Sequence, residues 1–251
     1  MASRISETAV SSARTSARER LIVALDVSSA RQARELVTSL GDIPGFYKVG
    51  LQLFTAEGPE FVRELAGAGH KVFLDLKLHD IPNTVARAVT SACGLGTSML
   101  TVHAGGGAAM LKAAVEAAGD RLTLLAVTVL TSMNDDELTQ VGVTGRVLDQ
   151  VLRLGDLAQS AGCKGVVASA RESSQLRQRL GEGFAIVNPG VRPPGTEQND
   201  QRRVATPAEA IRAGASHLVV GRPITQAADP AKAAREIVAQ IAQAASDFVT
   251  P

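Results

Sequence analysis

A lysine lies between two aspartates at the end of an apolar run, in the order Asp75, Lys77 and Asp80. Side chains alternate between the two faces of a strand, so Asp75 and Lys77 share one face with Phe73. Asp80 follows after the strand has ended, close enough to fold back toward the lysine. A cluster of this kind at an active site suits proton transfer and charge stabilisation. Because buried charges are costly unless they are paired, an ion-pair network that only closes the strand end is the structural alternative.

The elements that must position this cluster are short β-branched runs, which alternate with Ala-rich helical stretches from residue 21 onward. We expect strands at residues 21–26, 46–50, 71–77, 99–103, 123–130, 165–169, 185–188 and 217–221. We expect helices at residues 30–40, 59–68, 84–94, 108–118, 145–161, 171–180, 206–213 and 231–245. The strands are near-continuous runs of Val, Ile and Leu, which is typical of parallel strands covered by helices.

Eight strand–helix repeats in a chain of this size predict an α/β fold, a closed (β/α)8 TIM barrel formed as a single domain over residues 21–251. An open doubly wound sheet is the competing architecture, but it usually has fewer strands and a glycine-rich fingerprint after its first strand. Here the first strand is followed by Leu25-Asp26-Val27-Ser28, which contains no glycine. The sequence therefore favours the barrel.

Unusual polar residues gather where the predicted strands end, and in such barrels the chemistry collects at the carboxyl ends of the strands. Besides the first cluster, they are Asp26, Lys48, His103, Thr131, Ser132, Asn188, Pro189, Gly190, Gly221 and Arg222. Purely structural charges would be expected on both rims, so this one-sided distribution favours a functional cluster. Asp26 and Lys48 end neighbouring strands and can pair, and taken alone a salt bridge at the rim explains that pair equally well.

The last two strands are each followed by a segment suited to binding a phosphate. After the final strand, Gly221 lets the backbone approach a ligand and Arg222 offers two parallel donors. Barrels commonly hold phosphate in the loops after strands seven and eight. Arg192 lies in a loop rich in proline and glycine, residues 188–195, that continues as a polar connection through residue 203. We interpret this segment as a lid whose Arg192 and Gln201 meet the same phosphate. For the segment after the final strand, the alternative interpretation is an ordinary glycine turn at Gly221 followed by a surface arginine.

Composition limits the classes of function. Of the 251 residues, 45% are hydrophobic and 20% are charged, and the formal net charge is +1. This balance argues against a general surface for nucleic acids or anionic membranes, so any preference for anions must be local. Aromatic residues make up only 3%, which leaves no stacking platform for single strands. No His, Cys, Asp or Glu cluster has metal-binding spacing, and we interpret His79 and His103 as structural.

The remaining features bear on location. Cys93 and Cys163 match no metal spacing, and we favour free cysteines in a cytoplasmic protein. No apolar run is long enough to span a bilayer. Residues 1–20 are rich in Ser, Ala, Thr and Arg but lack the apolar centre of a secretory signal, and Glu7 and Glu19 weaken a transit-peptide interpretation. We expect residues 1–20 to be a disordered or loosely held leader.

With these residues in view, the chain resembles the orotidine 5′-phosphate decarboxylase family from residue 21 to about residue 245. The segments that carry the resemblance are, in order, Ala24-Leu25-Asp26, Lys48-Val49-Gly50, Asp75-Leu76-Lys77-Leu78-His79-Asp80-Ile81-Pro82-Asn83-Thr84, Leu130-Thr131-Ser132, Pro189-Gly190-Val191-Arg192-Pro193, Asp200-Gln201-Arg202-Arg203 and Gly221-Arg222-Pro223-Ile224-Thr225. Two departures are mild: Leu78 stands where an aromatic residue is common, and Asn188 stands where threonine is often found. Neither position carries chemistry.

The resemblance implies decarboxylation of orotidine 5′-phosphate to UMP and CO₂, the last step of de novo pyrimidine biosynthesis, without a metal or an organic cofactor. It implies that Lys77 donates a proton to C6 of the pyrimidine, that Asp75 lies beside the departing CO₂, and that Lys48 holds the charged network and the ribose. The other substrate-binding residues that it implies are Asp26 at a ribose hydroxyl, Thr131 and Ser132 at the ribose or pyrimidine, Pro189, and Arg192, Gln201, Gly221 and Arg222 at the phosphate. It also implies a homodimer in which Asp80 and Thr84 complete the partner's site.

Two other functions compete with this one. Related barrels that act on sugar phosphates also carry an Asp-x-Lys-x-x-Asp strand end. They need Mg²⁺, however, and lack the combined features at residues 81–84 and 189–193. A non-enzymatic sensor of nucleotide phosphates on a degenerate barrel is the second alternative. The charged residues are all intact, which argues against degeneracy.

Overall fold

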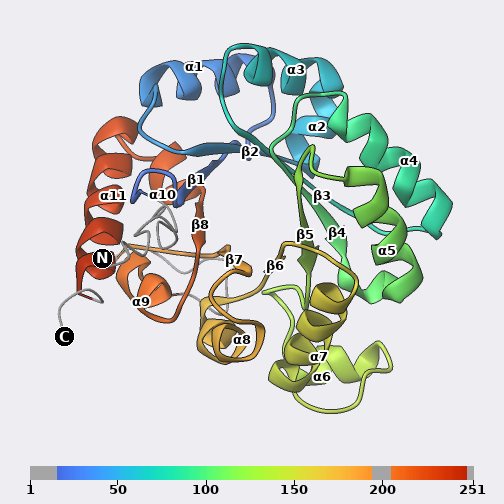
Figure 1. The fold of residues 1–251 in the computed structure, drawn as a ribbon. Helices are drawn as coiled ribbons and strands as arrows, with labels where there is room; N and C mark the ends of the chain where they lie inside the picture. Colours follow the sequence, from blue (N-terminus) through green and yellow to red (C-terminus); the bar gives the residue numbers. More distant parts are fainter. Residues whose placement is uncertain (1–15, 194–204, 248–251) are drawn as a thin grey trace, which may run out of the picture.

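The computed structural model describes residues 16–193 and 205–247. Their strands are all parallel and pair in sequence order, and the pairing of β1 with β8 closes the barrel. The strands are β1 (Leu21–Ala24), β2 (Phe46–Gly50), β3 (Val72–Leu78), β4 (Met99–His103), β5 (Thr123–Val127), β6 (Gly165–Val167), β7 (Ala185–Asn188) and β8 (His217–Val220). Figure 1 looks into the ring that they form.

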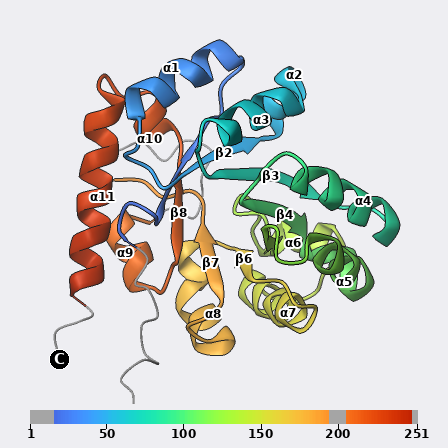
Figure 2. The ribbon, with the colours of Figure 1, turned by 45° about the horizontal axis from the view of Figure 1, so that its top comes forward.

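Helices surround the strands on the outside, as Figures 1 and 2 show. They are α1 (Ala30–Leu40), α2 (Leu51–Glu57), α3 (Pro59–Gly67), α4 (Pro82–Cys93), α5 (Gly107–Ala118), α6 (Asp135–Gln140), α7 (Val147–Ser160), α8 (Ser173–Leu180), α9 (Pro207–Arg212), α10 (Arg222–Thr225) and α11 (Pro230–Ser246), with short 3₁₀ turns η1 (Ala104–Gly106) and η2 (Ala170–Glu172). The last helix, α11, packs against α1 and α9. This architecture confirms the predicted (β/α)8 barrel and excludes the open doubly wound sheet.

Strand alternation divides the apolar side chains between two cores. One core fills the barrel interior and includes Phe46, Phe73 and Val187. The residues that face the other way join a larger core between the strands and the helices. Lys48 and Asp75 each follow an inward-facing phenylalanine by two positions, so their side chains share its inward direction. The same alternation that builds the interior core therefore directs two charged groups to the mouth of the barrel.

Several helix ends match the capping signals of the sequence. Thr206 caps α9 in a reciprocal arrangement with Glu209, and Pro207 occupies the first turn. The helices α5 and α8 end at Gly119 and Gly181, both of which have positive φ. Local sequence and tertiary fold therefore agree at these ends.

The strands β1, β5, β6 and β8 end earlier than predicted. β5, for example, ends at Val127 although Val129 is buried as well. Apolar residues continue past the last ladder hydrogen bonds, so hydrophobicity alone overestimates the strand. As a result, Asp26 lies in the loop after β1 and does not end the strand itself. The short helices α2, α6 and α10 were not predicted, because segments of seven, six and four residues carry too few apolar repeats.

Residues 16–20, the described part of the expected leader, lie at the N-terminal rim of the barrel. The Arg20 guanidinium donates a hydrogen bond to the Ala215 carbonyl at 3.4 Å, and Lys71 pairs with Glu19 at 3.3 Å. The rest of the expected leader, residues 1–15, lies outside the described residues. Within the part of the chain that the structure describes, no helix has the length and apolar character needed to cross a membrane.

Candidate active site

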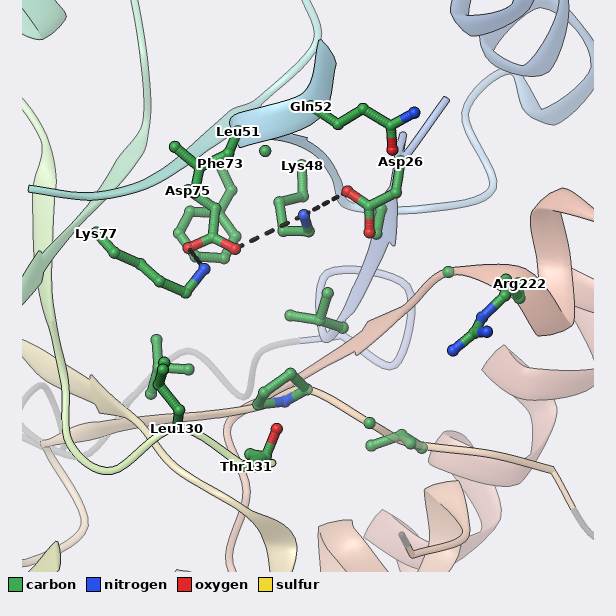
Figure 3. Close-up of a pocket in the computed structure, with 18 of the residues that line it drawn as sticks. Asp26, Lys48, Leu51, Gln52, Phe73, Asp75, Lys77, Leu130, Thr131 and Arg222 are labelled. Carbon is green, nitrogen blue, oxygen red and sulfur yellow. Dashed lines mark hydrogen bonds and ion pairs between the residues drawn. The ribbon is translucent and has the colours of Figure 1, made fainter. Parts of the chain in front are cut away.

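A pocket of about 580 Å³ opens at the carboxyl ends of the strands and is shown in Figure 3. Asp26, Lys48, Asp75 and Lys77 line one part of it. Arg192 and Arg222 line the same pocket, together with Thr131 and Pro189. Residues that are distant in sequence meet here because parallel strands place all their carboxyl ends on one rim. The structure thus brings the lysine cluster and the candidate phosphate-binding arginines into one cavity.

The four charged residues form a continuous chain of ion pairs, marked by dashed lines in Figure 3. The Lys48 ammonium lies 2.8 Å from Asp26 Oδ1 and 3.6 Å from Asp75 Oδ2. The Lys77 ammonium lies 2.8 Å from Asp75 Oδ1. Asp75 is therefore the shared anion between two cations, and its side chain is only 13% exposed. Charges alternate in sign along the whole chain, which limits the cost of burying them.

The environment of Asp75 favours its ionised form. Burial by itself raises the pKa of this carboxyl group. The positive charges of Lys48 and Lys77 act in the opposite direction, and hydrogen bonds from Lys77 and Thr101 add to their effect. The pKa of Asp75 consequently lies below the ordinary value for an aspartate. A negative charge is thus maintained beside the Lys77 ammonium at neutral pH.

Lys77 has an unusual backbone conformation. Its φ is +50°, and among the described residues it is the only non-glycine residue with a positive φ. Such conformations cost of order 1–3 kcal/mol and persist where the surrounding structure holds them. The Lys77 N–H donates to Thr101 Oγ1 at 2.8 Å, which satisfies the group that this conformation turns away from the regular ladder. The backbone conformation of Lys77 is therefore locally unfavourable, and the surrounding structure maintains it.

Thr101 is the residue of this site that the sequence analysis missed. It lies on β4, is fully buried, and also donates to Asp75 Oδ1 at 3.0 Å. The available signal was its position: Thr101 precedes His103 by two residues and so faces the interior, where a hydroxyl group needs a partner. No property of the β4 sequence alone identifies that partner as Asp75.

Gly50 makes room for the paired charges. A Cβ atom added at this position would lie 2.8 Å from the Lys48 ammonium nitrogen and 3.1 Å from Asp26 Oδ1. Either contact would push the two groups apart. The Lys48–Asp26 pair thus occupies the space into which a side chain at position 50 would extend.

The arginines form the other part of the pocket. In the view of Figure 3, Arg222 lies across the pocket from Lys77. Arg192 is 9% exposed, and its backbone N–H donates to the Ala205 carbonyl at 2.9 Å. Its buried Nε atom has no hydrogen-bond partner among the described residues. Burial and the nearby charge of Arg222 lower the pKa of Arg192.

Asp80 and Thr84 do not join the pocket of their own chain. Both are exposed, and Asp80 Oδ1 accepts a hydrogen bond from the N–H of Ile81 at 2.6 Å. The described ion pairs include none between Asp80 and Lys77, in contrast to the expected fold-back toward the lysine. Ser132 is exposed and, unlike Thr131, does not line the pocket. Gln201 lies outside the described residues.

Two further groups have structural partners. His103 stacks on His79 with ring centroids 5.2 Å apart, and His103 Nδ1 accepts from the N–H of Gly105. Burial, followed by the positive charges of His79 and Lys77, lowers the pKa of His103. Asn188 is fully buried and bridges Ser173 to the Ala168 carbonyl. Among the described residues, no group of three or more His, Cys, Asp or Glu side chains could hold a metal ion.

Asp75→Asn tests whether the shared anion stabilises the fold. We expect the free energy of unfolding to fall by about 2 kcal/mol at pH 7, because two cations lose their common carboxylate. The folded pKa of Asp75 lies below the unfolded value of about 3.9, so its contribution is present above that pH and is lost as the pH falls through the folded value. The difference between the variant and the original protein should therefore shrink in acid, as measured by denaturant unfolding at pH 7 and pH 3.

The matched control is Asp156→Asn, which removes an exposed ion pair with Arg179. We expect a change of less than about 0.5 kcal/mol for this control. If Asp75→Asn were as stable as the original protein at pH 7, the carboxylate would not contribute to folding.

Comparisons with known proteins agree on one family. Residues 19–237 match the family described as "Orotidine 5'-phosphate decarboxylase / HUMPS family". An orotidine 5′-phosphate decarboxylase of Rhodopseudomonas palustris (strain BisB5) is 54% identical over 228 residues, which cover 90% of this chain and 96% of the relative. One from Moorella thermoacetica is 50% identical over 237 residues, covering 91% and 94%. The crystal structure of orotidine 5′-phosphate decarboxylase from Lactobacillus acidophilus superposes with a TM-score of 0.79 at 40% identity, covering 88% of this chain and 98% of that one. The chain belongs to the orotidine 5′-phosphate decarboxylase / HUMPS family.

Proposed function

We propose that this protein decarboxylates orotidine 5′-phosphate to UMP and CO₂, the last step of de novo pyrimidine biosynthesis, without a metal or organic cofactor. The names of its relatives support the substrate and the reaction. The observation that carries the proposal is the Lys77 ammonium, 2.8 Å from Asp75 Oδ1 in the same pocket as Arg192 and Arg222. One end of the pocket then acts on the pyrimidine, and the other end holds the phosphate.

Lys77 supplies the acid for the reaction. When the bond between C6 and the carboxylate breaks, CO₂ leaves and the electron pair stays on C6, where delocalisation is poor. A fixed ammonium close to C6 stabilises this charge and then transfers a proton to the carbon. UMP is formed, and the neutral amine regains its proton from water. The chemistry needs a cation at one fixed position, which the ion-paired lysine provides.

Asp75 and Lys48 prepare the site for this step. Asp75 lies beside the substrate carboxylate, and the repulsion between the two anions is relieved as CO₂ departs. Lys48 pairs with both Asp26 and Asp75, which keeps the two carboxylates apart and correctly directed. Asp26, whose side chain is 54% exposed, has a free edge for accepting a hydrogen bond from a ribose hydroxyl group. Thr131 and Ser132 contact the ribose or the pyrimidine.

The phosphate is held by Arg192, Gln201, Gly221 and Arg222, with Pro189 as a further substrate contact. The orphaned Nε of Arg192 and the lowered pKa of its guanidinium support an anion at this position. A Cβ atom added at Gly221 would lie 3.6 Å from the Cβ atom of Ala24, which is an ordinary contact distance. Packing against the described residues therefore does not require glycine at this position. Binding energy from a phosphate remote from C6 can be used to align the pyrimidine for the reaction.

The active form is a homodimer in which Asp80 and Thr84 enter the partner's site, with Asp80 as the fourth charged residue of the catalytic set. Two observations support this arrangement: neither residue lines the pocket of its own chain, and Ile81, next to Asp80, is 66% exposed. An exposed large apolar side chain beside a functional segment is typical of an interface. We place the protein in the cytoplasm, with no nucleic-acid or membrane partner.

The decisive experiment follows the loss of orotidine 5′-phosphate spectrophotometrically, in the presence of excess chelator. We expect the protein to turn over under these conditions and Lys77→Ala to lose more than about 10⁴-fold in kcat, because both the charge and the proton are removed. UMP should still bind to Lys77→Ala within about tenfold of the original affinity, since the phosphate contacts remain.

Lys71→Ala is the matched control, because Lys71 precedes β3 at the opposite rim and pairs only with Glu19 among the described ion pairs. Its kcat should be unchanged. Near-normal turnover by Lys77→Ala would remove this lysine from the mechanism. Activity that disappears with chelator and returns with Mg²⁺ would instead favour a metal-dependent sugar-phosphate enzyme.

Arg222→Ala should weaken UMP binding by about 10- to 100-fold, because a charged donor to the phosphate is lost. The affinity for uridine, which has no phosphate, should change far less. Calorimetric titration with both ligands separates these effects, and Arg212→Ala, which removes an exposed pair with Asp247, serves as the control. An unchanged UMP affinity would mean that the phosphate binds elsewhere.

Hybrid dimers test whether Asp80 acts across the interface. Lys77→Ala and Asp80→Asn should each be nearly inactive when pure. After the two variants are mixed and their subunits exchanged, half of the dimers are hybrids, and each hybrid has one site with both residues intact. We expect activity to return to about a quarter of the original level. No recovery despite proven exchange would place Asp80 in the site of its own chain.

A further inference from the structure

The third strand has an irregularity at the charged cluster. β3 and β4 pair at Leu74 with Leu100 and again at Leu78 with Val102. Between these two pairs, β3 carries Asp75, Leu76 and Lys77, whereas β4 carries only Thr101. Three residues therefore stand opposite one, and β3 bulges at the position of both reactive side chains.

The bulge interrupts the hydrogen bonds that would otherwise fix this segment. Extra residues in a bulge leave backbone groups outside the regular ladder. Lys77, at φ +50°, would have a partly buried N–H without a strand partner. Thr101 Oγ1 accepts that N–H at 2.8 Å, so a side-chain hydroxyl group replaces the missing carbonyl of β4. The strained conformation of Lys77 thus depends on one hydroxyl group.

The same hydroxyl group also controls Asp75. The Thr101 oxygen accepts the hydrogen bond from the Lys77 N–H, and the Thr101 hydroxyl group donates its own proton to Asp75 Oδ1. The distance between these two oxygens is 3.0 Å. The same Asp75 Oδ1 atom also accepts a hydrogen bond from the Lys77 ammonium, whose nitrogen lies 2.8 Å away. The contacts form a closed ring, from the Lys77 backbone through Thr101 and Asp75 back to the Lys77 side chain. Each member limits the movement of the other two.

We propose that Thr101 is a positioning residue for the decarboxylation, whose hydroxyl group holds the β3 bulge so that the Asp75 carboxylate and the Lys77 ammonium meet the substrate in a fixed geometry. This inference rests on the proposed function. Thr101 does not line the pocket, so it acts through its two neighbours and not on the substrate. A displacement of about 1 Å at reacting groups can cost about 10²-fold in rate, so one distant hydrogen bond can be important for catalysis.

Thr101→Val, which removes the hydroxyl group and keeps the shape, is the test. We expect kcat to fall by about 10- to 100-fold, with UMP affinity within about threefold of the original value. Thr101→Ser keeps the hydroxyl group and should restore most of the lost kcat. Thr97→Val is the matched control, because Thr97 is equally buried and its hydroxyl group donates only to the Ala92 carbonyl. It should lose similar thermal stability with unchanged kcat.

The acid limb of the pH profile gives a readout that general loss of packing would not move. Thr101 is one of the donors that lower the pKa of Asp75, so its removal raises that pKa, and activity should begin to fall at a higher pH than in the original protein. The other charged groups near Asp75 are Lys48 and Lys77, with Asp26 reached through Lys48 and His103 further along β4. Thr101→Val leaves all of them in place.

Three results would overturn the inference: an unchanged kcat and pH profile in Thr101→Val, a Thr101→Ser variant as slow as Thr101→Val, or a loss of UMP binding as large as the loss of kcat. Carbon-13 NMR titration of Asp75, assigned with Asp75→Asn, separates this inference from the proposed function. If the original protein failed to consume orotidine 5′-phosphate, the function would be wrong. A raised Asp75 pKa in Thr101→Val would still support the role of the hydroxyl group, and an unchanged one would reject it.

Discussion

One buried carboxylate governs the organisation of this barrel mouth. Asp75 is 13% exposed, and burial alone would favour its neutral form. Two ammonium groups and one hydroxyl group keep it ionised: Lys48 on β2, Lys77 on the same strand β3, and Thr101 on β4. A single neutral substitution at any of these groups would leave a largely buried charge with fewer partners. The cluster therefore behaves as a unit, and its geometry depends on the pairing of β2, β3 and β4.

The bulge in β3 explains how one strand can bring the charged groups of Asp75 and Lys77 together. In a regular strand, the side chains of Asp75 and Lys77 would project from the same face in the same direction, so their charged groups would lie side by side. The conformation of Lys77 at φ +50° turns the chain so that its ammonium returns to the carboxylate of Asp75. Unusual backbone conformations gather at functional sites because the arrangement they permit is useful. Here the unfavourable conformation is held by hydrogen bonds that lie within the same ring.

Much of the fold and part of the site follow from the sequence alone. Continuous Val, Ile and Leu runs identified all eight strands, and the polar residues at their ends identified the rim on which the pocket lies. Thr101 was beyond this reasoning, because strand alternation gives its direction but the three-to-one register at the bulge decides its partner. Short-range reasoning also predicted Asp80 near Lys77, whereas the carboxylate bonds to its own chain at Ile81. Local spacing therefore predicts which residues share a face, but contacts across elements require the register of the barrel.

The distribution of charge within the pocket separates two tasks that the overall composition conceals. The chain has a net charge of +1, which gives no general attraction for anions. Among the described residues that line the pocket, two lysines lie with Asp26 and Asp75 at one end, and Arg192 and Arg222 lie at the other. Charges alternate in sign at the lysine end, whereas two side chains of the same sign converge at the Arg192–Arg222 end. Under the proposed function, a phosphate at the arginine end would orient the substrate so that its reacting carbon reaches the Lys77 ammonium.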